Sequence, residues 1–248
     1  MPGLFKMENQ DFSCSPRPLH DIFTAVPSRY DLINRVITLG MDKRWRRLAA
    51  QACVEDKPHR LLDLGCGTGD LTINIALAAG KEAEIVGLDY SEPMLQIARR
   101  KARAAGVEKQ VSFIYGEATQ IAFLDGHFDA VGISFAFRNL TYKNPLGPPH
   151  LAEVYRVLRP GGRYVIVESS QPENIVIRAF FHLYLRAFVA PVGQILSGNK
   201  GAYNYLAEST RRFYTPGEVR EMLLTAGFRD IRYRPLFFGA AGLHIALK

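Results

Sequence analysis

The stretch LLDLGCGTGDLTINIAL, from Leu61 to Leu77, constrains the fold more than any other part of the sequence. An apolar run of strand character ends in Gly65, Gly67 and Gly69, and a helical pattern begins directly after them. Glycine permits positive φ angles and a close approach of the backbone to a ligand, so this turn is suited to wrap a small molecule. The stretch alone leaves two interpretations, a ligand-binding loop and a tight strand–helix turn without a ligand.

Strand-like and helical segments alternate along most of the 248 residues. Near-continuous apolar strands between helices are typical of a parallel sheet that helices cover on both faces. We therefore expect an α/β fold with a mostly parallel, seven-stranded sheet. The expected strands are 60–64, 83–89, 111–116, 128–134, 162–168, 229–237 and 241–247, and the expected helices between them are 69–79, 91–105, 149–158 and 215–228, the last with Thr215 as N-cap.

The chain is long enough for one large domain preceded by an arm. Residues 1–20 contain charges and prolines but no apolar core of a secretory signal, and the three scattered cysteines are typical of a reducing compartment. We therefore expect a flexible arm over 1–20, a single domain over 21–248 and a cytoplasmic location. The expected parts of the domain are an N-terminal helical part (21–58), a ligand-binding core (59–170), a helical lid (171–214) and a C-terminal helix with two strands (215–248).

The spacing of the glycines and two acidic residues distinguish the interpretations of the loop. A dinucleotide-binding loop has the pattern G-x-G-x-x-G, whereas the glycines here follow G-x-G-x-G. Asp63 lies at the end of the first expected strand, and Asp89 ends the second, where an acid can bind ribose hydroxyls. The agreement of strand, loop and distal acid favours a bound ligand over a bare turn.

The run DLGCGTGDL resembles motif I of the class I methyltransferases that use S-adenosylmethionine. GEATQIAF (116–123), SFAFRNL (134–140) and RVLRPGGRYVIVE (156–168) fit the same family after its third strand, after its fourth strand and before its fifth strand. The resemblance implies a Rossmann-like methyltransferase fold and S-adenosylmethionine as cofactor.

Four further runs resemble one branch of these enzymes, the ubiquinone/menaquinone biosynthesis C-methyltransferase family, and the resemblance covers roughly residues 20–248. Members of this family methylate a ring carbon of a polyprenylated benzoquinol or naphthoquinol. The resemblance implies such a quinol as acceptor; we favour demethylmenaquinol and keep the benzoquinol step as the alternative. The runs are RYDLINRVITLGMDKRWRR (29–47), ISFAFRNLT (133–141), YNYLAESTRRF (203–213) and AAGLH (240–244).

The family pattern, carried over by position, implies cofactor contacts from the glycine loop and from the ends of the strands. Three positions depart from it: Glu117 stands where the family often has Asn, Tyr142 replaces an expected acid, and NPLGPP (144–149) lengthens the following loop. The contact with adenine and the geometry of that loop can therefore differ. The implied cofactor-binding residues are Asp63, Gly65, Gly67, Thr68, Gly69, Asp89, Tyr90, Glu117, Ala118 and Ser134.

Methylation of a quinol ring carbon requires that the neighbouring hydroxyl lose its proton, because a phenol of pKa about 10 is mostly protonated at neutral pH. Arg138 follows the fourth expected strand, at the edge where α/β folds bind ligands, and its guanidinium can donate to the oxyanion but is a poor base. The resemblance adds Asn139 and Tyr30 as orienting partners. The alternatives are a surface salt bridge for Arg138 and a packed core aromatic for Tyr30. His244 is the one candidate for a conventional base, and no cluster predicts a metal site.

The segment NIVIRAFFHLYLRAFVAPVG (174–193) is aromatic and helical in period, and Arg178, His182 and Arg186 lie along one stripe. We expect its helix to end before Pro191 after about 16 residues, which is too short and too charged to span a bilayer. Such a helix suits a membrane interface or the cover of an apolar chain, and a core helix of the lid is the alternative.

The net charge of +7 and the basic run 43–47 favour an anionic partner, either nucleic acid or a membrane surface. Adenine-directed nucleic-acid methyltransferases usually carry Asp/Asn-Pro-Pro-aromatic after the fourth strand and cytosine-C5 enzymes a cysteine, and residues 134–137 have neither. We therefore expect no nucleic acid, and peripheral contact with the inner face of the membrane; a homodimer stays open. A small soluble acceptor and a non-catalytic cofactor-binding scaffold remain alternatives, although the Arg138–Asn139 pair argues against the scaffold.

Overall fold

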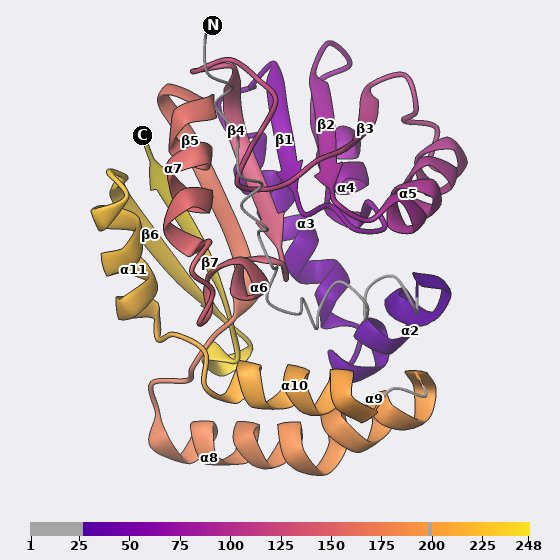
Figure 1. Cartoon of the computed structure of the whole chain (residues 1–248), viewed down its shortest axis with the longest axis vertical. Helices are drawn as coiled ribbons and strands as arrows, with labels where there is room; N and C mark the ends of the chain where they lie inside the picture. The colour runs from indigo at the N-terminus through magenta and orange to yellow at the C-terminus, as the bar shows by residue number, and fades with distance from the viewer. Residues whose placement is uncertain (1–26, 198–199) are drawn as a thin grey trace, which may run out of the picture.

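The computed structural model describes residues 27–197 and 200–248, and these contain a seven-stranded sheet in the order β3-β2-β1-β4-β5-β7-β6 (Figure 1). The pairs among β1 to β5 are parallel, whereas β7 runs antiparallel to both β5 and β6. The expected mostly parallel sheet is confirmed. Its strands are β1 (Arg60–Leu64), β2 (Glu84–Asp89), β3 (Val111–Tyr115), β4 (Phe128–Ser134), β5 (Leu158–Ser169), β6 (Arg229–Leu236) and β7 (Ala241–Leu247).

Strand β5 begins four residues earlier than its apolar pattern predicts, at Leu158 rather than Gly162. Leu158 pairs with Phe128, the register then shifts, and pairing resumes between Arg163 and Ala130. The residues between the two pairings therefore form a bulge, which accommodates the proline and glycines that otherwise predict a turn.

Helices cover both faces of the sheet, because its central strands are apolar on both sides. On β1, Leu61 packs in one core cluster with α3 and α4, and Leu62 packs in a second cluster with α7 and α11. The sheet therefore lies between two helical layers, with its carboxyl edge left for a ligand. The helices of these layers are α3 (Met41–Cys53), α4 (Asp70–Ala78), α5 (Glu92–Ala104), α6 (Phe137–Thr141), α7 (Gly147–Val157) and α11 (Pro216–Thr225); α2 (Pro27–Ile37) precedes them.

Helix α11 begins as the sequence predicts. The Thr215 hydroxyl accepts a hydrogen bond from the Glu218 backbone N–H, and the Glu218 carboxylate accepts one from the Thr215 N–H. This reciprocal capping box satisfies two N–H groups that the helix itself cannot, and Pro216 occupies the first turn, where no donor is needed.

The described part of the lid is helical between Ile175 and Arg211 and lies across the carboxyl edge of the sheet, at the bottom of Figure 1. It consists of α8 (Ile175–Tyr184), a π-helical turn η1 (Leu185–Val189), α9 (Ala190–Ser197) and α10 (Lys200–Arg211). The expectation that the first helix ends before Pro191 is wrong. In the π-helical turn the Ala190 N–H donates to the Leu185 carbonyl, five residues back, and this widened turn carries the helix past the proline.

The continuous helix Ile175–Leu196 therefore has 22 residues, and by length and composition it is long and apolar enough to cross a membrane. The prediction that it is too short to span is consequently also wrong. Its inner side packs on the domain, since Leu185 and Val189 are buried in a cluster with Ala207 of α10.

Candidate functional site

The glycine loop turns sharply between β1 and α4, and all three of its glycines have positive φ angles. Gly65 and Gly67 have φ angles of +65° and +53°, which side chains other than glycine rarely adopt. A Cβ on Gly65 would lie 2.9 Å from the Ala136 Cβ, whereas Gly67 faces open space. The Gly67 N–H donates to Oδ2 of Asp89 at 2.8 Å, which joins the loop to the end of β2.

A cleft of about 80 Å³ lies over the carboxyl ends of β1, β2 and β4. The structure brings six of the predicted cofactor-binding residues together along this cleft. They are Gly65, Gly67, Asp89, Tyr90, Ala118 and Ser134.

The other four predicted cofactor residues do not line the cleft. A Cβ on Gly69 would lie 2.9 Å from Ala98, so this glycine allows α4 to approach α5. The Thr68 hydroxyl donates to Oδ1 of Asp31 at 2.7 Å, away from the cleft. Asp63 lies fully buried beside α4, and Glu117 pairs with Gln120 through its backbone in an isolated β-bridge. The loop itself therefore lies at the cleft, whereas the side chains of Thr68 and Asp63 contact Asp31 and Thr72.

Two buried carboxylates accompany the loop. Burial raises the pKa of Asp63 to about 7, although the Thr72 hydroxyl donates to its Oδ2 at 2.5 Å, and Oδ1 has no hydrogen-bond partner in the described structure. Burial also raises the pKa of Asp89, against the N–H groups of Gly67 and Ser91 that donate to its two oxygens. Both acids are therefore sensitive to any cation or donor placed next to them.

The cleft fits the nucleoside part of S-adenosylmethionine. Asp89 presents a carboxylate that can accept from ribose hydroxyls, and Leu88, Ala118 and Leu140 provide apolar surface for a base. The bare side of Gly67 lets a ligand approach the backbone closely. The residues present therefore match the cofactor that the sequence predicts.

A second, larger cavity of about 390 Å³ adjoins the cleft. Met94, Phe135 and Asn139 line both, so the two spaces meet at these residues. One wall of the cavity comes from α2, α3 and the start of α6, and the other comes from the lid and from η2 (Phe237–Gly239). The arrangement can hold a mostly apolar acceptor beside the cofactor.

Arg138 lines this cavity and is buried, so its interpretation as a surface salt bridge is wrong. Its Nη1 donates to the Ser209 hydroxyl of α10, and its Nε lies 3.9 Å from Oε1 of Glu168. Nε has no hydrogen-bond partner among the described residues. A buried cation in the wall of an apolar cavity can stabilise a developing anion.

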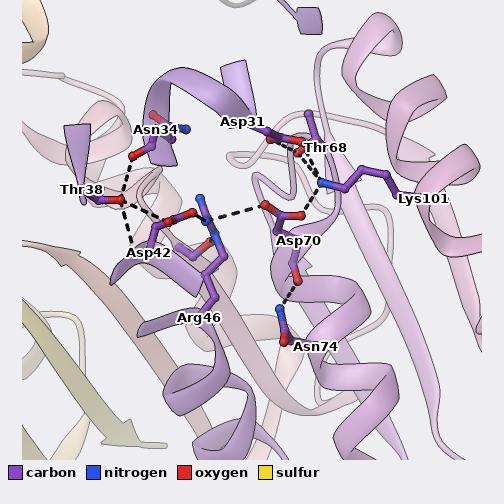
Figure 2. Close-up of polar contacts among 10 residues, drawn as sticks. Asp31, Asn34, Thr38, Asp42, Arg46, Thr68, Asp70, Asn74 and Lys101 are labelled. Atoms are coloured by element: carbon purple, nitrogen blue, oxygen red, sulfur yellow. Dashed lines mark hydrogen bonds and ion pairs between the residues drawn. The ribbon is translucent and has the colours of Figure 1, made fainter. Parts of the chain in front are cut away.

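A chain of polar contacts connects the N-terminal helices to the glycine loop, as Figure 2 shows. Lys101 of α5 contacts Asp31, Thr68 and Asp70, the last being the first residue of α4. Asp70 also lies 3.7 Å from Arg46 of α3. The wall built by α2 and α3 is therefore tied to the loop at the cofactor cleft.

Arg46 lines the cavity, and the sequence interpretation did not single it out as a site residue. It was grouped with the basic run 43–47, yet its side chain is buried and lines the cavity, whereas Lys43, Arg44 and Arg47 are exposed. Its Nη1 lies 2.6 Å from Oδ2 of Asp42, its Nε donates to the Ser134 hydroxyl at 3.3 Å, and its guanidinium lies 5.2 Å from the ring centre of Phe135. The spacing of Asp42 and Arg46, four residues apart on a helix, was the available signal.

Two other predicted residues have different outcomes. Tyr30 belongs to α2, but its side chain lies outside the residues whose placement the structure describes. His244 is buried against Tyr233, with ring centres 4.7 Å apart, and does not line the cavity. Burial lowers the pKa of His244 to about 4, so it is neutral near pH 7, but its position does not support a role as base.

Comparisons with solved structures show the fold alone. A SAM-dependent methyltransferase from Aquifex aeolicus is 20% identical, with a TM-score of 0.55 over 76% of this chain and 81% of that one. An O-methyltransferase family protein from Burkholderia thailandensis is 13% identical, with a TM-score of 0.64 over 89% of this chain and 59% of that one. The predicted Rossmann-like methyltransferase fold is confirmed.

Comparisons of sequence are more specific. A demethylmenaquinone methyltransferase from Thermus thermophilus is 44% identical over 90% of this chain and 98% of its own length. A protein of the same name from Deinococcus radiodurans is 40% identical over 93% and 92%. A ubiquinone/menaquinone biosynthesis C-methyltransferase from Dinoroseobacter shibae is 37% identical over 92% and 89%. The profile of the ubiE/COQ5 methyltransferase family matches residues 10–248, and this chain belongs to that family.

Proposed function

We propose that the protein transfers the methyl group of S-adenosylmethionine to a ring carbon of demethylmenaquinol, a step of menaquinone biosynthesis. The observation that carries this proposal is the 44% identity with the demethylmenaquinone methyltransferase of Thermus thermophilus, which extends over nearly the whole of both chains. The apolar cavity next to the cofactor cleft supports it, because a prenylated ring needs such a space beside the methyl donor.

The cleft residues bind and orient the cofactor, which when bound supplies an electrophilic methyl group on a sulfonium sulfur. Gly65 and Gly67 let it approach the backbone, and Asp89 accepts from its ribose hydroxyls. Asn139, which lines both spaces, orients the acceptor ring toward the cleft. Correct placement of two reactants contributes several kcal/mol, about 7–11 in favourable cases, to lowering a barrier.

Arg138 makes the acceptor nucleophilic. Its guanidinium lies in the cavity wall and stabilises negative charge on the oxygen next to the reacting carbon, so that the phenol loses its proton to water and the phenolate is favoured. Glu168 keeps the guanidinium in place: its Oε2 accepts from the Arg138 backbone N–H at 3.0 Å and its Oε1 faces Arg138 Nε. Because the surroundings are apolar, the electrostatic effect of this cation is stronger than it would be in water.

A benzoquinol of the ubiquinone pathway is the second candidate acceptor. The relative from Dinoroseobacter shibae carries both pathways in its name and is 37% identical over 92% of this chain. Either acceptor is a lipid, so we expect the protein to work from the cytoplasm in peripheral contact with the membrane.

The direct test is a methylation assay with purified protein, S-adenosylmethionine carrying a labelled methyl group, and chemically reduced acceptors. We expect a ring-methylated product from demethylmenaquinol by mass spectrometry, and slower turnover of the demethylated benzoquinol. Absence of ring methylation with both quinols would refute the proposal, and a faster benzoquinol reaction would reassign the pathway. Asp89→Asn should weaken cofactor binding in calorimetry, which separates a cofactor defect from an acceptor defect.

A further inference from the structure

The outward side of the lid helix Ile175–Leu196 is apolar along its length. Val176, Phe180 and Leu183 recur at helical spacing and are exposed by 59%, 68% and 59%, and Ile195 continues the side with 80%. Scattered exposed apolar residues are ordinary on soluble proteins, but a row along one helix marks an interaction surface.

The inward side of the same helix is apolar too. Leu185 and Val189 are buried in the cluster with Ala207, and the Tyr184 hydroxyl donates to the carbonyl of Ile37 on α2 at 2.9 Å. Apart from the stripe of Arg178, His182 and Arg186 the helix is apolar on both sides, and a wide apolar surface with a narrow basic stripe is typical of a helix at a membrane interface. Since the inward side already packs on the domain, it is the outward side that requires an apolar partner.

This surface continues into the acceptor cavity. Phe180, Phe237 and Phe238 line the cavity and are also exposed, so they form its rim. Phe237 and Phe238 are neighbours with φ angles of +45° and +55°, a conformation that costs free energy for a bulky residue. Two aromatic residues held in a strained backbone conformation at the mouth of an apolar cavity suit contact with an apolar medium outside it.

The charges of the lid indicate which apolar medium fits. No Asp or Glu occurs between Glu173 and Glu208, whereas Arg178 and the exposed Arg186 lie within the helix, and the whole chain carries a net charge of +7. Apolar side chains with cations and without acids are complementary to a bilayer with anionic headgroups.

We propose that the outward side of the helix Ile175–Leu196, together with Phe237 and Phe238, docks the protein on an anionic bilayer. The helix lies in the plane of the interface rather than across the membrane, because spanning would remove Leu185 and Val189 from their packing on α10. In this position the rim of the cavity opens into the lipid, so the tail of an acceptor enters without crossing water. The identity of that acceptor rests on the proposed function, whereas the docking rests on the surface itself.

The test measures co-sedimentation of the full chain with vesicles of phosphatidylcholine, with and without phosphatidylglycerol, in the absence of cofactor and quinol. We expect binding that increases with the anionic lipid. The double variant Val176→Glu/Leu183→Glu should weaken binding about tenfold, because two apolar contacts are replaced by charges that anionic headgroups repel. Neither residue lines the cavity, so methylation of a short-tailed acceptor in detergent should not change.

Leu77→Glu/Leu124→Glu is the matched control, since these leucines are also exposed but lie outside the lid. It should leave vesicle binding unchanged. Arg186→Glu is a second variant, which should weaken binding to anionic vesicles only. Circular dichroism and urea unfolding check that each variant is folded.

Three results would overturn the docking proposal: no binding by the original protein, equal losses in the lid and control variants, or a dimer that Val176→Glu/Leu183→Glu separates while vesicles stay unbound. The last would assign the surface to a second copy of the chain. A failure of the proposed function looks different, because vesicle binding would persist while no quinol is methylated in detergent.

Discussion

The two walls of the acceptor cavity hold their shape by different means. The wall from α2, α3 and α6 contains Asp42, Arg46 and Arg138, all buried, and each makes a directional contact with a partner. The wall from the lid and η2 is formed mainly by aliphatic and aromatic side chains, several of them exposed on their outer side. Directional contacts fix atoms to within a fraction of an ångström, whereas apolar packing tolerates variation in shape.

The contrast matches the two ends of a prenylated quinol. A ring that must present one carbon to a methyl donor needs fixed donors and charges, and a flexible tail needs only apolar surface. Substitutions in the polar wall should therefore produce large, specific losses, and substitutions in the lid wall should produce small losses that depend on the tail.

Breaking the ion pair between Asp42 and Arg46 should have the largest effect. Arg46→Met leaves the Asp42 carboxylate buried beside a single hydroxyl donor, Thr38, and we expect the free energy of unfolding to fall by about 4 kcal/mol in urea titrations. Removing both charges in Arg46→Met/Asp42→Leu should recover most of the loss, since a buried pair is often no more stable than apolar residues of similar size.

If Arg46→Met and the double variant are equally unstable, the pair is not the source of the stability. In that case the contacts of Arg46 with Ser134 and Phe135 would carry it.

Arg138→Ala should reduce kcat by roughly two to three orders of magnitude, or about 3–4 kcal/mol, because the donor to the acceptor oxygen is lost. Affinity for S-adenosylmethionine, measured by calorimetry, should stay unchanged, since Arg138 does not line the cofactor cleft. Arg159→Ala is the control: Arg159 is half-exposed, pairs with Asp129 away from the cavity and should not affect turnover.

A merely structural role of Arg138 would give a different result. Arg138→Ala leaves Glu168 buried with backbone donors only, so Arg138→Ala/Glu168→Gln should recover stability. Recovery of turnover in that double variant would remove Arg138 from the chemistry.

The sequence predicted the sheet, the glycine loop and the position of Arg138 at the carboxyl edge because each depends on local pattern or on position after a strand. It did not predict the contacts of Lys101 with Asp31 and Asp70. Asp31 is 70 positions away from Lys101 in the sequence and Asp70 is 31 positions away, so neither contact has a local signature. The direction of Thr68 was missed for the same reason, since its partner is also Asp31.

Pro191 was misread for another reason. The rule that proline ends a helix describes regular α-helical turns, and here a π-helical turn precedes it. A sequence pattern does not distinguish the two kinds of turn. The sequence therefore predicts a short helix before Pro191, and only the structure shows the full length of the lid helix Ile175–Leu196.

The free energy of unfolding should depend on pH through the buried carboxyl of Asp63. Its pKa is about 7 in the folded protein against 3.8 for a free carboxyl, so the folded state holds the proton more tightly. The stabilisation of the folded protein by protonated Asp63 is fully present below about pH 4 and is lost as the pH rises through about 7. Asparagine cannot ionise, so the free energy of unfolding of Asp63→Asn, measured in urea, should rise relative to that of the original protein by about 2 kcal/mol as the pH increases from about 5 to about 8. A constant difference across that range would show that Asp63 is ionised throughout.

The smallest effect is expected in the lid wall, and it should appear in only one kind of substrate. Ile177 lines the cavity from α8, and Ile177→Ala removes apolar contact worth about 1 kcal/mol, so KM for a long-tailed acceptor should rise about fivefold. The value of kcat should not change, because the tail is held equally in the ground and transition states. A tail-free acceptor should show neither change, and Ile195→Ala, on the outward side, should be silent in detergent. Should Ile177→Ala instead lower kcat with the tail-free acceptor, the lid would position the ring as well, and the division of labour between the walls would fail.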